Sequence, residues 1–322
     1  MVRALLTCLI SSVLSGIVAA TPTDERLRWT ADIQEHVSRD GQAVEILSGN
    51  VRFWKGELQL ITEHAEYYRG YERVYFSGSV EMVRPGEVLT CDSLVFYNGE
   101  NKIHAWGDTV RFVTENDIIT CREFVYWTEL DSGIARREVV MTQAARRLTT
   151  EELHYHMTGG LRGGSFWAEG AVEIMEGDRR VSGQRMTYDD TTGMLDLIGD
   201  AAISERDREL RGNRIHLVYD GDDLRSGLVE EGAEGTALIQ AWLSAERRDL
   251  QSFTDELTSR RMEAGFVDNR LASLNLLGMA TSIYHVVEDS ILQGMNHATG
   301  DTLTMDFDST GQLVRIRVKG GR

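Results

Sequence analysis

The stretch that decides the fold begins with Gly49-Asn-Val-Arg-Phe53 and continues through Gly78-Ser-Val-Glu-Met82 to Gly107-Asp-Thr-Val-Arg-Phe112. A second pattern alternates with these segments. It reads Leu60-Ile-Thr-Glu-His-Ala-Glu-Tyr67, then Leu89-Thr-Cys-Asp-Ser-Leu-Val-Phe96 and Ile119-Thr-Cys-Arg-Glu-Phe-Val-Tyr126. Apolar side chains recur at every second position, which places them on one face of a β-strand. The stretch therefore predicts a repeat made of strand pairs.

The repeat continues along nearly the whole chain. Later copies of the second pattern begin at Leu148, Val181 and Leu210, and weaker ones at Leu257 and Ala298. A Gly-x-apolar-x-apolar segment precedes each copy, except that Arg137 takes the glycine position once. A period of about 30 residues is typical of a solenoid or array. We expect an all-β fold, an elongated antiparallel sheet of about sixteen strands in about eight pairs, with a bulge in the second strand of each pair at positions such as Gly183 and Gly212.

The two ends of the chain lead to different expectations. Arg3, the apolar run 4–18 and the small residues of Val18-Ala-Ala20 predict a cleaved signal peptide over residues 1–20 and export from the cytoplasm. The repeats then occupy residues 21–235, and residues 236–322 continue them with longer insertions. Residues 239–257 fit either a helix or strands; we favour strands at both edges, with a short helix or a long loop near 241–250.

The net charge and the absence of known motifs argue against several classes of function. The formal net charge is −17, and no cluster of Lys and Arg forms the basic face that nucleic-acid binding needs. No catalytic elbow, metalloprotease helix or phosphate loop is present, so we expect neither an enzyme nor a cofactor. Glu152, His154 and His156 alternate on one strand and could hold a metal ion; a solvated outer face explains them better, and we predict no metal site.

Cys91 and Cys121 hold the same place in successive repeats. If those repeats place the two residues on neighbouring strands, a disulfide is geometrically feasible, and an exported chain can oxidise its thiols. Two buried free thiols are the alternative.

The alternating Gly-x-Val-x-Phe and Leu-x-Thr/Cys-Asp-x-Leu-x-Phe-Tyr units resemble the OstA-like (organic solvent tolerance) family, which includes LptA-type lipopolysaccharide-transport proteins. The resemblance is clearest over Gly49 to Tyr219. It implies a β-jellyroll bent like a taco around an apolar groove. It also implies a periplasmic protein that carries lipopolysaccharide or a related glycolipid, works with other jellyroll modules joined by edge strands, and serves the outer-membrane translocon and outer-membrane assembly.

In such a fold the inward side chains would line the groove, where each buried methylene of an acyl chain contributes ~0.8 kcal/mol. An ordinary packed core would present the same periodicity, so a structural β-solenoid acting through protein contacts is the alternative. The predicted groove residues are Val51, Phe53, Leu60, Tyr67, Val80, Met82, Leu94, Phe96, Val110, Phe112, Phe124, Tyr126, Leu153, Tyr155, Val172, Ile174, Met186 and Tyr188.

Overall fold

A computed structural model describes residues 26–157, 164–221, 223–244, 250–310 and 313–320. These residues form nineteen strands and one short 3-10 turn, η1, at Arg69–Tyr71. The strands are β1 (Arg28–Thr30), β2 (Ile33–Arg39), β3 (Gln42–Lys55), β4 (Leu58–Tyr68), β5 (Arg73–Arg84), β6 (Glu87–Tyr97), β7 (Lys102–Val113), β8 (Asp117–Trp127), β9 (Ser132–Gln143), β10 (Arg146–Met157), β11 (Gly164–Glu176), β12 (Arg179–Asp189), β13 (Met194–Glu205), β14 (Arg208–Asp220), β15 (Asp223–Trp242), β16 (Leu250–Val267), β17 (Arg270–Glu288), β18 (Ile291–Phe307) and β19 (Leu313–Lys319).

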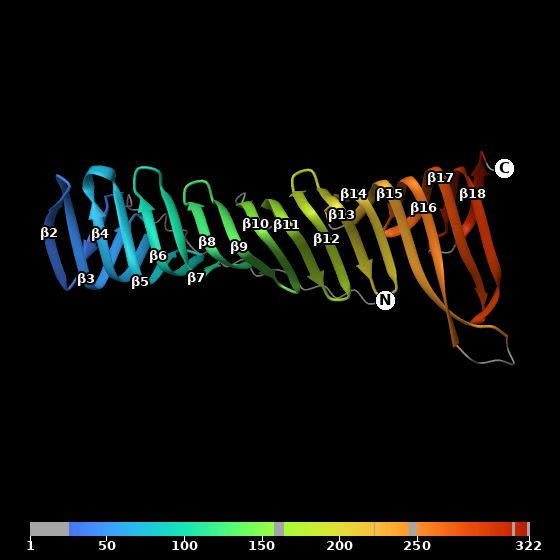
Figure 1. Ribbon diagram of the computed structural model, residues 1–322, viewed down its shortest axis with the longest axis horizontal. Coiled ribbons are helices and arrows are strands. Elements are labelled where there is room, and N and C mark those ends of the chain that lie inside the picture. The colour runs from blue at the N-terminus through green and yellow to red at the C-terminus, as the bar shows by residue number, and fades with distance from the viewer. Residues whose placement is uncertain (1–25, 158–163, 222, 245–249, 311–312, 321–322) are drawn as a thin grey trace, which may run out of the picture.

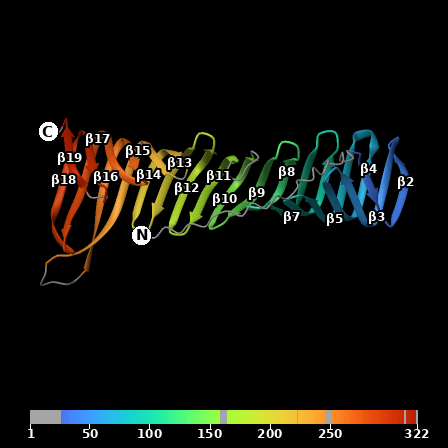
Figure 2. The ribbon, with the colours of Figure 1, turned by 180° about the vertical axis from the view of Figure 1, so that it is seen from behind.

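The strands form one continuous sheet. From β2 to β19 each strand pairs antiparallel with its neighbours in sequence, while β1 pairs with the second half of β3. The sheet runs the length of an elongated molecule, from β2 at one end to β18 and β19 at the other (Figures 1 and 2). The predicted antiparallel jellyroll is confirmed. The eight predicted pairs are β3–β4 through β17–β18, and the structure adds β1, β2 and β19 at the ends.

The bulges lie on the first strand of each pair, so their predicted position on the second strand is wrong. In the β3–β4 ladder, Gly49 and Asn50 stand opposite the single residue Glu63. Both bulge residues have left-handed backbone angles, φ 76° and 46°, which glycine adopts without steric cost. Gly183 and Gly212 lie on the unbulged strands, where a Cβ atom would meet the side chains of the next strand. They permit close packing there rather than a bulge.

A bulge bends its strand, and each strand therefore contributes to two walls that face each other. We call wall A the half that ends at the turns from odd-numbered to even-numbered strands, such as 56–57. Wall B is the half that ends at the turns from even-numbered to odd-numbered strands, such as 69–72. Phe53 of wall A and Phe76 of wall B pack with ring centroids 4.9 Å apart, which places the core between the walls.

Strand register gives the interior its order, because one inward residue of each strand pairs with the next across the sheet. The inner row of wall A runs Phe53, Leu60, Met82, Leu89, Phe112, Ile119, Met141, Leu148, Ile174, Val181, Ile203, Leu210, Gly235 and Leu257. The deep row of wall B runs Leu47, Ala65, Phe76, Leu94, Ala105, Phe124, Ala135, Leu153, Ala168, Met186, Leu197, Ile215, Val229, Met262, Leu276 and Leu303.

The C-terminal repeats differ by having longer strands. The predicted strands at both edges of 239–257 are confirmed, since β15 ends at Trp242 and β16 begins at Leu250, while 245–249 lie outside the described residues. The two strands extend beyond the rest of the sheet (Figure 1). The Trp242 N–H donates to the carbonyl of Ser290, 2.8 Å away, so the end of β15 lies beside the start of β18. The expected boundary at 235/236 falls inside β15 and stays a prediction.

The described part of the chain contains no helix long and apolar enough to cross a membrane. The predicted signal peptide, residues 1–20, lies outside the described residues.

Candidate functional site

The predicted groove residues all come from the rows that face the interior. Apart from Tyr67 and Tyr188, which are half-buried, every one of them is at most 9% exposed. Their common inward orientation follows from the two-residue period of the strands. Burial alone leaves their role as groove residues a prediction.

From β3 to β10 the interior is filled by side chains. The Phe112 ring of wall A contacts Phe124 and Tyr126 of wall B, with centroids 5.0 and 5.2 Å apart. Tyr155 stacks on Phe124 at 6.1 Å. Large aromatic residues thus span the space between the walls, and this part of the molecule is a packed core.

In this region, hydrogen bonds also connect the outer ends, or rims, of the two walls. Lys55, at the rim of wall A, donates from Nζ to the carbonyl of Asn98 (2.9 Å) and to Oδ1 of Asn101 (2.6 Å), both on the rim of wall B. The same ammonium lies 5.6 Å from the centroid of the Phe96 ring. A pocket of about 370 Å³ remains between the two rims here, lined by Lys55, Leu58 and Phe96 among others.

Arg84 makes the second tie. From wall A it donates to the carbonyl of Thr128 and to the Tyr126 hydroxyl, each at 2.6 Å, and pairs with Asp131, all on wall B. It also pairs with buried Glu87 (2.6 Å), which accepts a 2.8 Å hydrogen bond from Tyr126. Burial and the adjacent carboxylate raise the pKa of Tyr126 far above its usual value. A buried charged network of this kind holds the rims in one arrangement.

The interior changes between β11 and β16. On wall A the inner row is here Val181, Ile203, Leu210, Gly235 and Leu257, and each is partly exposed. On the facing wall, Phe166, Tyr188 and Leu195 are also partly exposed. The deep row beneath them stays buried, from Met186 to Met262.

The cause is side-chain length. Where β3, β5 and β7 place Phe53, Met82 and Phe112, the equivalent positions of β13 and β15 hold Ile203 and Gly235, and β12 holds Val181 where β4 holds Leu60; these side chains reach less far across the interior. Among the residues that the structure describes, we find no hydrogen bond that ties the rims from β11 to β14. The result is a stretch of interior with a buried floor and partly exposed apolar residues on both walls. We call this feature the slot.

The slot residues of wall A were absent from the predicted groove set, although the repeat could have identified them. Val181 and Leu210 begin copies of the second pattern, at the position that Leu60 occupies in the first copy. What the sequence alone could not indicate is that this position is covered in β3–β10 and partly exposed in β11–β16.

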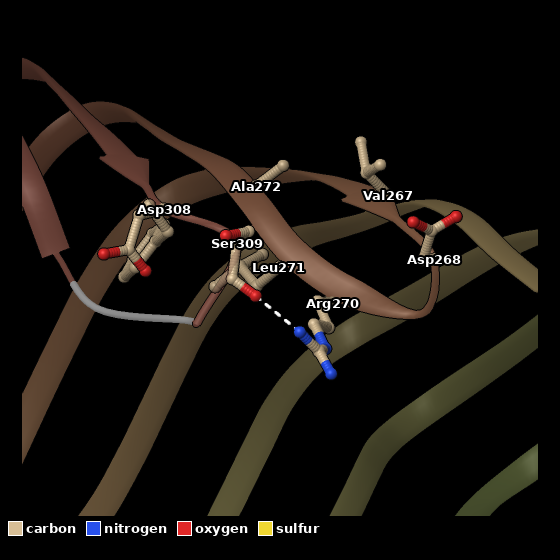
Figure 3. A pocket seen from close by; sticks show the side chains of 8 residues that line it. Val267, Asp268, Arg270, Leu271, Ala272, Asp308 and Ser309 are labelled. Carbon is tan, nitrogen blue, oxygen red and sulfur yellow. Dashed lines mark hydrogen bonds between the residues drawn. The ribbon is translucent and has the colours of Figure 1, made fainter. Parts of the chain in front are cut away.

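A second pocket, of about 380 Å³, lies on wall B beyond the slot. It is formed at the turn from β16 to β17 and the end of β18 (Figure 3). Arg270 donates to the carbonyl of Ser309 across it, at 2.5 Å. Leu271 and Phe307 provide its apolar lining.

Of the two alternatives left open for Cys91 and Cys121, the structure shows two buried free thiols. Cys91 lies on β6 and Cys121 on β8, and β7 lies between them, since Arg111 of β7 pairs with both Thr90 and Thr120. Strands two apart are separated by about 9.6 Å, whereas a disulfide needs Cα atoms about 4.4–6.8 Å apart.

Glu152 and His154 contact each other rather than forming a metal site. His154 Nε2 lies 2.5 Å from Glu152 Oε1, and Arg136 donates to the other carboxylate oxygen at 2.9 Å. Although partial burial acts to raise it, the pKa of Glu152 is lowered by these hydrogen bonds. His156 is exposed. No group of three or more His, Cys, Asp or Glu able to hold a metal ion occurs in the described ranges.

Comparison with known proteins supports the resemblance expected from the repeats. The family described as OstA-like protein matches residues 61–193. Among solved structures, the crystal structure of LptH from Pseudomonas aeruginosa, the LptA-homologous periplasmic component of its lipopolysaccharide transport device, is similar at 17% identity and a TM-score of 0.34. The match covers 38% of this chain and 98% of LptH. No curated protein matches the chain. The OstA-like match is thus confined to residues 61–193, less than half of the chain.

Proposed function

We propose that this protein is a periplasmic module of lipopolysaccharide transport that holds the acyl chains of the glycolipid in the slot between β11 and β16. The observation that carries the proposal is the change from a filled, tied interior to an apolar interior that is partly open to solvent. An acyl chain entering the slot would gain ~0.8 kcal/mol for each methylene it buries. The OstA-like match and the predicted signal peptide support an envelope role of carrying rather than catalysis.

The ends of the sheet suggest how the module would join its partners. β2 and β19 are the terminal strands, and they expose Ile33 (59%) and Val314 (64%). Edge strands with free backbone groups pair readily with strands of another protein. We therefore assign to these edges the contacts with other jellyroll modules and, through them, with the outer-membrane translocon.

A photo-crosslinking amino acid tests the slot. Placed at Leu210 it would face the interior, whereas at the adjacent Arg211 it would face outward, because neighbouring residues of a strand point to opposite faces. We expect lipopolysaccharide to be captured in cells from position 210 and not from position 211. Equal capture at the two positions would refute the slot.

The packed interior of β3 to β10 favours a second candidate, a structural β-solenoid that works through protein contacts alone. It predicts that no lipid copurifies with the protein and that position 210 captures none. The two candidates therefore give opposite results in the same experiment.

A further inference from the structure

We propose that Arg146 and Arg179, at the rim of wall A, bind the phosphate or other anionic headgroup of the lipid whose acyl chains occupy the slot. The inference rests on the proposed function and adds a headgroup site to it. Three observations support it: the position of the two arginines above the apolar row, the stagger of the two walls, and what faces these side chains.

The register places both arginines at the top of the inner face. Arg146 and Arg179 are the first residues of β10 and β12. Each stands two positions before an inward apolar residue, Leu148 and Val181 respectively, and therefore shares its face. Each pairs weakly with a rim carboxylate, Arg146 with Glu176 at 3.4 Å and Arg179 with Glu205 at 3.6 Å. About half of each arginine side chain remains exposed.

The equivalent cations of the earlier repeats show what this rim position does. The last ladder pair at the rim is Lys55 with Leu58 in β3–β4 and Arg84 with Glu87 in β5–β6. In both cases the cation reaches oxygen atoms of wall B, at a turn three strands further along. The β9–β10 and β11–β12 repeats also have a cation in this pair, Arg146 with Gln143 and Arg179 with Glu176.

The same offset of three strands predicts that Arg146 lies opposite the end of β12 and Arg179 opposite the end of β14, where wall B carries Tyr188 and Tyr219. Burial and the hydrogen bond to the Asp190 carboxylate raise the pKa of Tyr188 to about 12, and the nearby Arg146 opposes that rise. Burial likewise raises the pKa of Tyr219, against the influence of Arg179 and Arg146. Both tyrosines are thus neutral hydroxyls near the two guanidinium groups.

Guanidinium groups bind phosphate and carboxylate oxygens through paired N–H donors. The Tyr219 hydroxyl adds one further donor, whereas Tyr188 already donates to Asp190 Oδ1 at 3.0 Å. A headgroup oxygen would take the place that the wall B oxygens occupy around Lys55 and Arg84. Acyl chains would then lie below, against Val181 and Ile203. The ligand class that fits is an amphiphile with several acyl chains and an anionic headgroup.

The experiment compares two probes, a bisphosphorylated acylated glucosamine disaccharide and the same lipid without phosphates. Capture by a photo-crosslinker at Ile203 of the full chain is the readout. For Arg146→Gln/Arg179→Gln we expect at least about tenfold weaker capture of the phosphorylated lipid, which corresponds to ~1.4 kcal/mol, and unchanged capture of the other. The matched control is Arg147→Gln/Arg180→Gln, which removes the same charge from the adjacent outward positions and should change neither.

Equal loss for both lipids, or the same loss in the control pair, would overturn the headgroup site. Saturable binding of inorganic phosphate that the Arg146→Gln/Arg179→Gln change abolishes, with lipid capture unchanged, would assign the arginines to free phosphate and overturn it as well. If the protein with both arginines unchanged captures neither lipid from Ile203, that result would instead refute the slot. The double change should fold, since exposed ion pairs contribute only about 0–1 kcal/mol, and circular dichroism checks this.

Discussion

At the scale of single residues, burial decides the chemistry of the two cysteines. Cys91 and Cys121 lie in the filled interior, where loss of water disfavours a thiolate. Burial raises the pKa of Cys91 to about 12 and that of Cys121 to about 11. Neither thiol is therefore prepared to react or to pair in the native protein.

Because the thiols are buried, the free energy of unfolding is expected to fall at alkaline pH. In the unfolded chain both thiols ionise near pH 9, whereas in the native protein they stay protonated up to about pH 11. The unfolded state thus binds fewer protons above pH 9, and the free energy of unfolding falls as the pH rises, by about 1.4 kcal/mol per pH unit for each thiol. We expect the loss between pH 9 and pH 11 to be smaller in Cys91→Ala/Cys121→Ala, measured by urea unfolding. An identical pH dependence in both proteins would contradict it.

Arg84 connects the two walls across the packed region. It joins a buried carboxylate, a buried tyrosine and the opposite rim in one network. Because an unpaired buried charge is costly, the members of this network hold one another in place. The sequence shows Arg84 and Glu87 three residues apart, but their partners Tyr126 and Asp131 lie 42 and 47 residues further on from Arg84.

At the scale of strands, the bulge is the element that turns a flat sheet into two walls. Gly78, Gly107 and Gly170 of the first pattern lie at bulges, and a carboxylate from the preceding strand covers each of them. Gly78 is covered by Glu63, Gly107 by Asp92 and Gly170 by Glu151. This explains why carboxylates recur at this place in the repeat without forming a site of their own.

Crowding at these glycines leads to a prediction about Gly170. Its φ is +87°, and a Cβ atom would lie 2.7 Å from that of Glu151. Gly177, at the following turn, also has a positive φ (+59°), but nothing lies within 4 Å of its added Cβ. An alanine costs about 1–2 kcal/mol at either site because of its backbone angles. The overlap adds about 1–3 kcal/mol at Gly170 alone.

Chemical denaturation of Gly170→Ala and Gly177→Ala therefore measures the packing contribution as the difference between two otherwise similar changes. A Gly170→Ala protein as stable as the Gly177→Ala protein would show that the bulge relaxes around the new methyl group.

At the scale of the whole molecule, one repeat serves two purposes. β3 to β10 form a packed, tied core, and β11 to β16 form the slot. Local stability follows buried apolar contacts and protected hydrogen bonds. We therefore expect backbone amides of β4 to β9 to exchange with deuterium more slowly than those of β12 to β15, measured by mass spectrometry on the full chain. Edge fraying does not account for this difference, because both groups of strands are interior to the sheet. Uniform exchange across the two regions would contradict the division.

Much of this organisation could be predicted from the sequence. The two-residue period of Val51 and Phe53, and its recurrence every 30 residues or so, indicated strands, pairing and an inward face. The weak copies at Leu257 and Ala298 lie in β16 and β18 as expected. These features are local, since they depend on the alternation of side chains along one strand. The same alternation recurs in every repeat.

Other features depend on which strands face each other, and periodicity carries no information on that. The sequence could not indicate that β7 separates Cys91 from Cys121, nor on which strand the bulge falls. The groove that it predicts in the best-kept repeats stays a prediction, and Phe112 and Tyr126 pack against each other there. The sequence by itself determined a repeated, two-walled β-sheet with an apolar interior. Only the tertiary structure decided where that interior is filled and where it is open, because this depends on how far side chains from distant strands reach across the gap.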